Sequence, residues 1–92
     1  MERSHLVSVI MPCYNSGQFV IDSILSVLNQ SYRHLELICV DDNSTDNTLE
    51  TLQRLALKDN RMRVVKNEAN RGPGYSRNIG IDFASGRFIA FC

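Results

Sequence analysis

The segment from Leu37 to Asp46 constrains the fold of this chain more than any other stretch. Its first four residues are all apolar, without the polar alternation of a half-exposed strand, which is typical of a strand buried on both faces of a parallel sheet. Two adjacent carboxylates, Asp41 and Asp42, follow this run directly. Open α/β sheets bind ligands at the carboxyl ends of their strands, so these carboxylates indicate where a functional site should lie.

Four apolar segments of strand length alternate with three segments of helical periodicity. The predicted strands are residues 6–11, 35–41, 63–66 and 87–92. The predicted helices are residues 17–30, 45–58 and 72–84, in which apolar residues recur at helical spacing. Strands separated by helices of about ten to fifteen residues indicate βαβ units with right-handed crossovers. The predicted fold class is therefore α/β with a parallel sheet.

Turn and cap residues set the expected boundaries of these elements. Pro12 has no ladder donor and is expected to end the first strand. Ser44, with Asp46 and Asn47 in the turn after it, is expected to cap the second helix. Gly86 is expected to close the third helix in the left-handed conformation that favours glycine. The loops that follow the first three strands then share one rim of the sheet.

Charge and cysteine content narrow the classes of partner. Ten basic and ten acidic residues give a formal net charge of zero, which argues against a nucleic-acid partner. No apolar run is long enough to span a bilayer, and the first residues do not resemble a signal peptide, so a cytoplasmic protein without a membrane span is expected. Cys13, Cys39 and Cys92 lack metal-site spacing and are expected to be reduced thiols that pack in the core.

Chemically useful side chains gather in or beside the three loops of the rim. They are the ring of Tyr14, the carboxylates of Asp41 and Asp42, the amides of Asn15, Asn43 and Asn70, and the guanidinium groups of Arg71 and Arg77. This set suits a nucleotide, because an aromatic face stacks on a base, a carboxylate accepts a ring N–H and arginine binds phosphate.

Each of these residues also has a purely structural interpretation. Tyr14 can be a packing residue, and residues 42–44 can be only a turn and helix cap. Asp46 fits the first turn of a helix, where the helix dipole favours a carboxylate. Arg71 and Arg77 can be solvated surface charges. Only the joint occurrence of these residues on one rim favours the functional interpretation.

Four sequence blocks occur in a characteristic order. They are Val7 to Asn15, Ser26 to Tyr32, Glu36 to Asp46, and a last block that joins Asn70-Arg71-Gly72, Arg77-Asn78 and Gly86 to Phe91. Together they resemble the N-terminal half of family 2 inverting glycosyltransferases of the GT-A fold. The resemblance implies a Rossmann-like sheet of four strands in the order 3-2-1-4 with helices on both faces. Residues 1–92 would be the nucleotide-sugar-binding portion of such a domain, which would be incomplete.

The resemblance implies transfer of a sugar from a nucleotide-sugar donor, most often a UDP-sugar, to a glycan or lipid-linked acceptor. Pro12 and Tyr14 would line the base pocket, and Asp41 would shape it. Asp42 would accept a hydrogen bond from the pyrimidine ring N–H, and Arg77 would approach the diphosphate. The remaining members of the expected nucleotide-binding set are Asn15, Asn70 and Arg71.

In this family a metal-binding Asp-x-Asp motif follows the fourth strand, and Mg²⁺ or Mn²⁺ held there bridges the donor diphosphate. The motif would begin after Cys92, so we expect no metal ligand, no catalytic residue and no sugar transfer within this chain alone. The apolar edge from Arg87 to Cys92 would be uncovered and is expected to form a homodimer. The complete protein is expected in the cytoplasm, with peripheral attachment to the inner face of the plasma membrane left open.

Two alternatives from other classes stay open. A non-catalytic fragment or scaffold would use the exposed sheet edge to bind another protein. A receiver-type phosphorelay module has a similar acidic pair, but its phosphorylatable aspartate would follow another strand, and residues 63–67 contain none.

Overall fold

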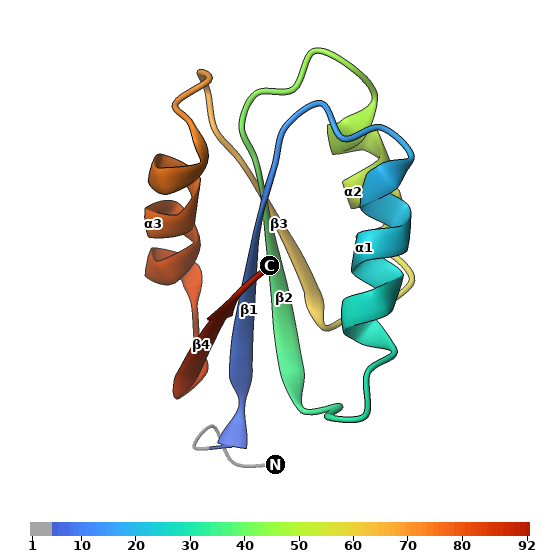
Figure 1. The fold of residues 1–92 in the computed structure, drawn as a ribbon, viewed down its shortest axis with the longest axis vertical. Helices are drawn as coiled ribbons and strands as arrows, with labels where there is room; N and C mark the ends of the chain where they lie inside the picture. Colours follow the sequence, from blue (N-terminus) through green and yellow to red (C-terminus); the bar gives the residue numbers. More distant parts are fainter. Residues whose placement is uncertain (1–4) are drawn as a thin grey trace.

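Residues 5–92, which the computed structural model describes, form four strands and three helices in strict alternation (Figure 1). The elements are β1 (Val7–Cys13), α1 (Phe19–Leu28), β2 (Leu35–Asp41), α2 (Thr48–Ala56), β3 (Met62–Lys66), α3 (Pro73–Phe83) and β4 (Phe88–Phe91). All strand pairs are parallel, and the strand order is β3-β2-β1-β4. These observations confirm the α/β class and the predicted order.

Helices cover both faces of the sheet, as predicted (Figure 1). Val9 of β1 and Leu37 of β2 pack with Ile24 of α1 and Leu52 of α2 in the main core. Because successive strand side chains point to opposite faces, the fully buried Ile10 points to the other face, toward α3. No helix among residues 5–92 has the length and apolar character needed to cross a bilayer.

β1 continues past Pro12, so the prediction that this proline ends the strand is wrong. The carbonyl of Ile10 faces β4 and accepts the N–H of Cys92, whereas the carbonyl of Cys13 faces β2 and accepts the N–H of Asp42. By strand alternation the nitrogen of Pro12 faces the β4 side, where pairing ends at Ile10. The missing donor therefore breaks no sheet bond, and β2 pairing continues to Cys13.

α2 begins at Thr48, so the prediction that Ser44 caps this helix is wrong. The N–H and the hydroxyl of Ser44 both donate to the carboxylate of Asp41, at 3.0 and 2.6 Å. This bonding holds the chain in a turn, in which Asn43 has a φ of 59°. Asp46 lies before the helix and accepts the N–H of Thr48 at 2.9 Å. Residues 42–47 are thus a loop that is longer than the cap residue predicted at Ser44 implied.

Gly86 does not close α3 in a left-handed conformation, which corrects a second boundary prediction. The helix ends at Phe83, and Ala84 is already extended with a φ of −69° and a ψ of 136°. A Cβ on Gly86 would lie 2.7 Å from the backbone oxygen of Leu6 and 2.7 Å from Oγ of Ser8. Glycine is required here because the chain passes against β1 as it enters β4.

The three thiols are free, as predicted, but only two of them pack in the core. Cys13 and Cys39 are buried, whereas Cys92 is exposed, so the packing prediction is wrong for Cys92. A hydrogen bond with Cys13, together with burial, raises the pKa of the Cys39 thiol. This thiol is therefore neutral and behaves as a small apolar side chain.

β4 is the least buried strand of the sheet. All four of its residues are exposed, and Phe88 and Phe91 show 55% and 53% of their surface. No other strand within residues 5–92 pairs with its outer edge. Homodimer formation through the edge from Arg87 to Cys92 stays a prediction.

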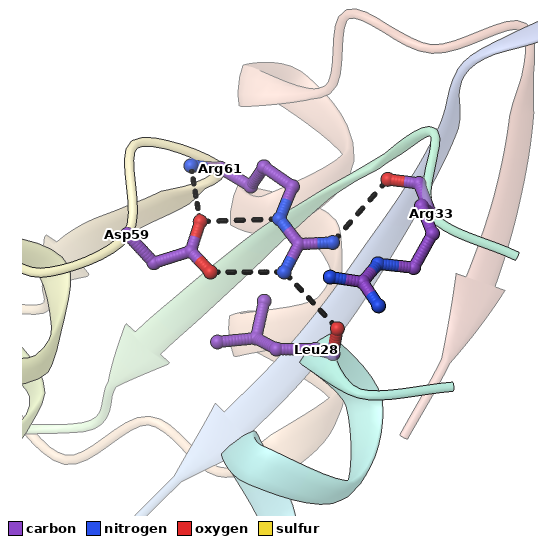
Figure 2. A network of polar contacts seen from close by, with 4 residues as sticks. All are labelled: Leu28, Arg33, Asp59 and Arg61. Carbon is purple, nitrogen blue, oxygen red and sulfur yellow. Dashed lines mark hydrogen bonds and ion pairs between the residues drawn. The ribbon is translucent and has the colours of Figure 1, made fainter. Parts of the chain in front are cut away.

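One arginine joins three segments at the amino ends of β2 and β3 (Figure 2). Arg61 donates to the carboxylate of Asp59 through Nε at 3.1 Å and Nη2 at 2.9 Å. The same guanidinium donates to the carbonyl oxygens of Leu28 at 3.0 Å and Arg33 at 3.3 Å. The planar fork of arginine serves all these acceptors at once, which fixes the end of α1 against the segments that enter β2 and β3.

Replacing Asp59 with asparagine should lower the free energy of unfolding by about 1 kcal/mol at neutral pH. The hydrogen-bonded Arg61 holds the pKa of Asp59 below its usual value. A lowered carboxyl pKa stabilises the fold above the unfolded pKa, and this contribution disappears as pH falls through the folded value. Urea unfolding across acidic pH measures it, with Asp82→Asn as the exposed control. A loss that stays constant down to low pH would contradict this origin.

Candidate functional site

The loops after β1 and β2 are tied together at the carboxyl rim of the sheet. The N–H of Asn15 donates to Oγ of Ser44 at 3.0 Å, and its side-chain oxygen accepts the N–H of Thr45 at 2.8 Å. Asn15 adopts a φ of 47°, and the Ser44 hydroxyl donates onward to the fully buried Asp41. Asn15 and Asp41 therefore tie the two loops to each other.

Thr48, the first residue of α2, anchors the β1 loop from below. Its fully buried Oγ1 accepts the N–H groups of Ser16 and Gly17 at 2.9 and 3.1 Å. The same hydroxyl donates to Asp46 at 2.5 Å. This bond is the main cause that holds the pKa of Asp46 below its usual value, and the bond from the Thr48 N–H is the second. Sequence reasoning missed Thr48, because a threonine at a helix start gives no sign of partners about thirty positions earlier in the chain.

Replacing Thr48 with valine should destabilise the fold by about 2 kcal/mol. Valine keeps the shape of threonine but leaves the N–H groups of Ser16 and Gly17 without their acceptor. Urea unfolding measures the loss, and amide hydrogen exchange should rise at these two residues. Thr51→Val is the matched control, since Thr51 is also buried on α2 but its hydroxyl accepts only a 3.5 Å contact from Arg54. Equal losses in both variants would contradict the anchoring role.

Asp42 closes the third loop onto the rim. Its Oδ1 accepts the side-chain N–H of Asn67 at 3.0 Å and the backbone N–H of Arg71 at 2.8 Å, and its Oδ2 accepts the N–H of Gly72 at 2.8 Å. Asn67 also donates to Oγ of Ser76 on α3 at 3.0 Å. Gly72 has a φ of 92°, a conformation that requires glycine at this turn. Asp42 thus joins β2, β3 and α3 at one point.

The charge state of Asp42 follows from these contacts. Burial alone raises its pKa, but the N–H of Arg71, the amide of Asn67 and the N–H of Gly72 outweigh burial, and the net pKa lies below its usual value. The group is therefore an ionised acceptor at neutral pH. A carboxylate offers about four acceptor positions, two on each oxygen, so Oδ2 can accept one further donor.

A cavity of about 260 Å³ opens beside this carboxylate. It is lined by residues from the ends of β1 and β2, the third loop and the first turn of α3: Pro12, Cys13, Tyr14, Asp42, Asn70, Gly72, Pro73 and Ser76. Four of the eight expected site residues line it, namely Pro12, Tyr14, Asp42 and Asn70. The volume lies just below the usual range for small-molecule pockets, about 300 to 1,000 Å³, and suits a single ring system rather than a whole nucleotide sugar.

The other four expected residues lie outside the cavity lining. Asn15 and Asp41 bond the loops after β1 and β2 to each other. The guanidinium carbon of Arg71 lies 5.5 Å from the centre of the Tyr75 ring, so Arg71 bonds to Asp42 through its backbone N–H, and its charge also lowers the pKa of Asp42. Arg77 is exposed on α3, one turn after Pro73 and on the same helix side.

Asn67 and Ser76 are the site residues that sequence reasoning missed. Both are buried, and they bond to each other and to Asp42 through the Asn67 amide. Asn67 is the first residue after β3, a position that points to the rim. Ser76 is a small polar residue on the helix face that packs on the sheet, next to Gly80 one turn later. Ser76 could have been found from the sequence, because a polar residue at a buried helix position needs a hydrogen-bond partner.

The described residues do not provide a metal site. No group of three or more His, Cys, Asp or Glu side chains that could hold a metal ion occurs among residues 5–92. Asp41 and Asp42 already accept hydrogen bonds from protein donors at both oxygens. A requirement for Mg²⁺ or Mn²⁺ therefore stays a prediction from the family resemblance.

A parallel sheet in this order, with helices on both faces and a cavity at the carboxyl ends of its strands, is a Rossmann-like α/β fold. The model of the family described as glycosyl transferase family 2 matches residues 8–92. The chain belongs to glycosyl transferase family 2, as the sequence blocks predicted.

Named relatives share sequence with this chain, and a solved structure shares both sequence and fold. The putative teichuronic acid biosynthesis glycosyltransferase TuaG of Bacillus subtilis is 46% identical over 94% of the chain and 34% of its own length. The UDP-Glc:alpha-D-GlcNAc-diphosphoundecaprenol beta-1,3-glucosyltransferase WfgD of Escherichia coli is 45% identical over 95% of the chain and 34% of its own length. The crystal structure of S. aureus TarS 1-349 in complex with UDP matches with a TM-score of 0.85 and 35% identity, over 94% of this chain and 26% of that one. The chain thus spans about a third of the length of these curated relatives.

Proposed function

We propose that this chain forms the nucleotide-binding part of a glycosyltransferase that uses a UDP-sugar as donor. The observation that carries the proposal is the rim cavity, which brings Tyr14 and Pro12 together with the ionised Asp42. A 35% identical structure was determined with UDP bound, and a 45% identical relative is named as a UDP-glucose transferase. These similarities support a uridine nucleotide over other donors.

In the proposed complex the uracil ring enters the cavity and stacks on Tyr14 against Pro12. The ring N–H donates to Oδ2 of Asp42, which has room for one more donor. Asn70, in the same lining, offers its amide to the ribose hydroxyls. Arg77, exposed on α3 one turn after the lining residue Pro73, approaches the diphosphate, which extends out of a cavity too small to enclose it.

Asp42 is a binding residue in this proposal and not the base that deprotonates an acceptor. A general base works best with a pKa near the operating pH, whereas contacts hold the pKa of Asp42 below its usual value. We assign sugar transfer to groups other than those of the rim cavity. The complete enzyme would act on a glycan or lipid-linked acceptor in surface polysaccharide synthesis, as the names of TuaG and WfgD suggest, and a cytoplasmic location stays a prediction.

Titration of the 92-residue chain with UDP and with CDP tests the proposal. Cytosine lacks the ring N–H of uracil, so UDP should bind about tenfold more tightly than CDP if a hydrogen bond to a carboxylate is made. Amide chemical shifts of Tyr14, Asp42 and Asn70 should change saturably, with or without Mn²⁺. The amide of Leu57, exposed at the end of α2, is the internal control. A folded chain that shows no such shifts, or that binds UDP and CDP equally, would contradict the proposal.

A further inference from the structure

The outer edge of β3 is unpaired within residues 5–92, because β3 is the first strand in the order β3-β2-β1-β4. The carbonyl of Arg61 and the N–H of Asn67 both bond to β2. Strand alternation then turns the N–H and carbonyl groups of Val64 and Lys66 away from the sheet. These groups form a short open ladder to which an extended chain can pair.

A second cavity, of about 320 Å³, lies between this edge and α3. Val65 of β3 and Ile79 of α3 supply apolar surface, and the rings of Tyr75 and Phe83 line its helix side. Both rings are 43% exposed, so they are accessible to a partner. A strand added to β3 would point every second side chain toward this cavity.

The groove formed by this cavity and the β3 edge is positively charged, although the chain as a whole is neutral. Lys66 and Arg71 line it, and Glu68 is the only carboxylate in its lining. Arg63 lies over the Phe83 ring, 5.7 Å from its centre, and donates to the Phe83 carbonyl at 2.9 Å. Its guanidinium is also in an ion pair with Glu36 at 3.8 Å, so Lys66 and Arg71 carry the positive charge of the groove.

We propose that this groove is a docking site for an extended acidic peptide segment of a partner protein, which adds to β3 as a fifth strand. The outward backbone groups of Val64 and Lys66 pair with the segment. Its alternate apolar side chains enter the cavity, and its carboxylates meet Lys66 and Arg71. A second copy of this chain is disfavoured, because pairing two β3 edges would bring like cations together.

The probe is a short fluorescent peptide in which aspartate alternates with valine and phenylalanine, added to the 92-residue chain. Saturable anisotropy changes are expected, together with slower amide hydrogen exchange at Val64 and Lys66. Lys66→Glu should weaken binding by about tenfold, since a like charge replaces an opposite one. The matched control Lys58→Glu, an equal charge change on the exposed end of the α2 segment, should bind like the unmodified chain.

A second pair of variants tests the backbone ladder. Val64→Pro removes an N–H that faces outward and should abolish peptide binding, whereas Val64→Ala keeps the N–H and should retain it. Circular dichroism checks that both variants are folded, and Lys66→Glu tests the groove independently if the proline variant unfolds.

Several results would overturn the docking site. A peptide with lysine in place of aspartate, or polyglutamate, that binds as tightly as the probe would show that the alternation of aspartate with apolar residues does not matter. Protection at Ile89 and Phe91 would place the peptide on β4 instead. Sedimentation that shows self-association blocked by Lys66→Glu would identify a second copy as the occupant.

Discussion

Replacing Asp42 with alanine is expected to lower the free energy of unfolding by about 3 kcal/mol and to remove saturable UDP binding. The stability loss follows because Asn67, Arg71 and Gly72 each lose a buried charged acceptor, and bonds to charged groups contribute about 1.5 to 3 kcal/mol each with incomplete additivity. The binding loss follows from the proposed uracil contact. Urea unfolding and UDP titration measure the two effects on the same samples.

Tyr14→Ala separates binding from folding at this site. Tyr14 is 46% exposed and contributes its ring to the cavity without bonding to Asp42. Its removal should weaken UDP binding by about tenfold while leaving the unfolding free energy within about 0.5 kcal/mol. If Asp42→Ala is destabilised but still binds UDP as well as the unmodified chain, the carboxylate only organises the loops. The acceptor role would then be wrong.

The stability effect of Asp42 also has a defined pH dependence. Its pKa in the folded chain is below the unfolded value, so its contribution is present above the unfolded pKa, near 4, and is lost as pH falls through the folded value. The difference in stability between the unmodified chain and Asp42→Ala should therefore shrink on acidification. A difference that grows at low pH would indicate that burial, and not the three donors, dominates the pKa of Asp42.

The fold and the centre of the site were predictable because they depend on short-range signals. The apolar run before Asp41 identified a buried parallel strand, and the adjacent acids placed the rim at its carboxyl end. Tyr14 and Asp42 directly follow strands and Pro12 lies one residue before the end of β1, so topology alone brings them to one cavity. The order of the strands came from the family resemblance, since local patterns do not specify which strands are neighbours.

The polar framework of the molecule was not predictable, because its partners are distant in sequence. Asn67 meets Asp42 across 25 positions, and Arg61 reaches Leu28 across 33. The cap prediction for Gly86 failed for the same reason, because contact with Leu6 and Ser8 determined the conformation there. The cap prediction for Ser44 failed through a local competitor, since the carboxylate of Asp41, three positions earlier, accepts both donors of Ser44. Local propensity is a weak guide where a tertiary contact satisfies the same group.

Replacing Gly80 with valine is expected to destabilise the fold by about 3 kcal/mol. A Cβ on Gly80 would lie 2.4 Å from Cγ2 and 3.2 Å from Cγ1 of Ile10, which is fully buried. The branched methyl of Ile10 sits next to its backbone and cannot rotate away without leaving its preferred rotamer. Urea unfolding measures the loss.

The contact between Gly80 and Ile10 also predicts that substitutions at both positions partly compensate each other. Ile10→Ala alone should lose about 4 kcal/mol by leaving a cavity, but in the double variant the carbons added by Gly80→Val would occupy that space. The double variant should therefore be more stable than the sum of the single losses by about 2 kcal/mol or more. Gly74→Val is the matched control on the same helix, because a Cβ there meets nothing within 4 Å. Strictly additive losses at Gly80 and Ile10 would show that the helix accommodates the added carbons by moving away from the sheet. The α3 wall of the rim cavity would then be adjustable instead of fixed by this glycine.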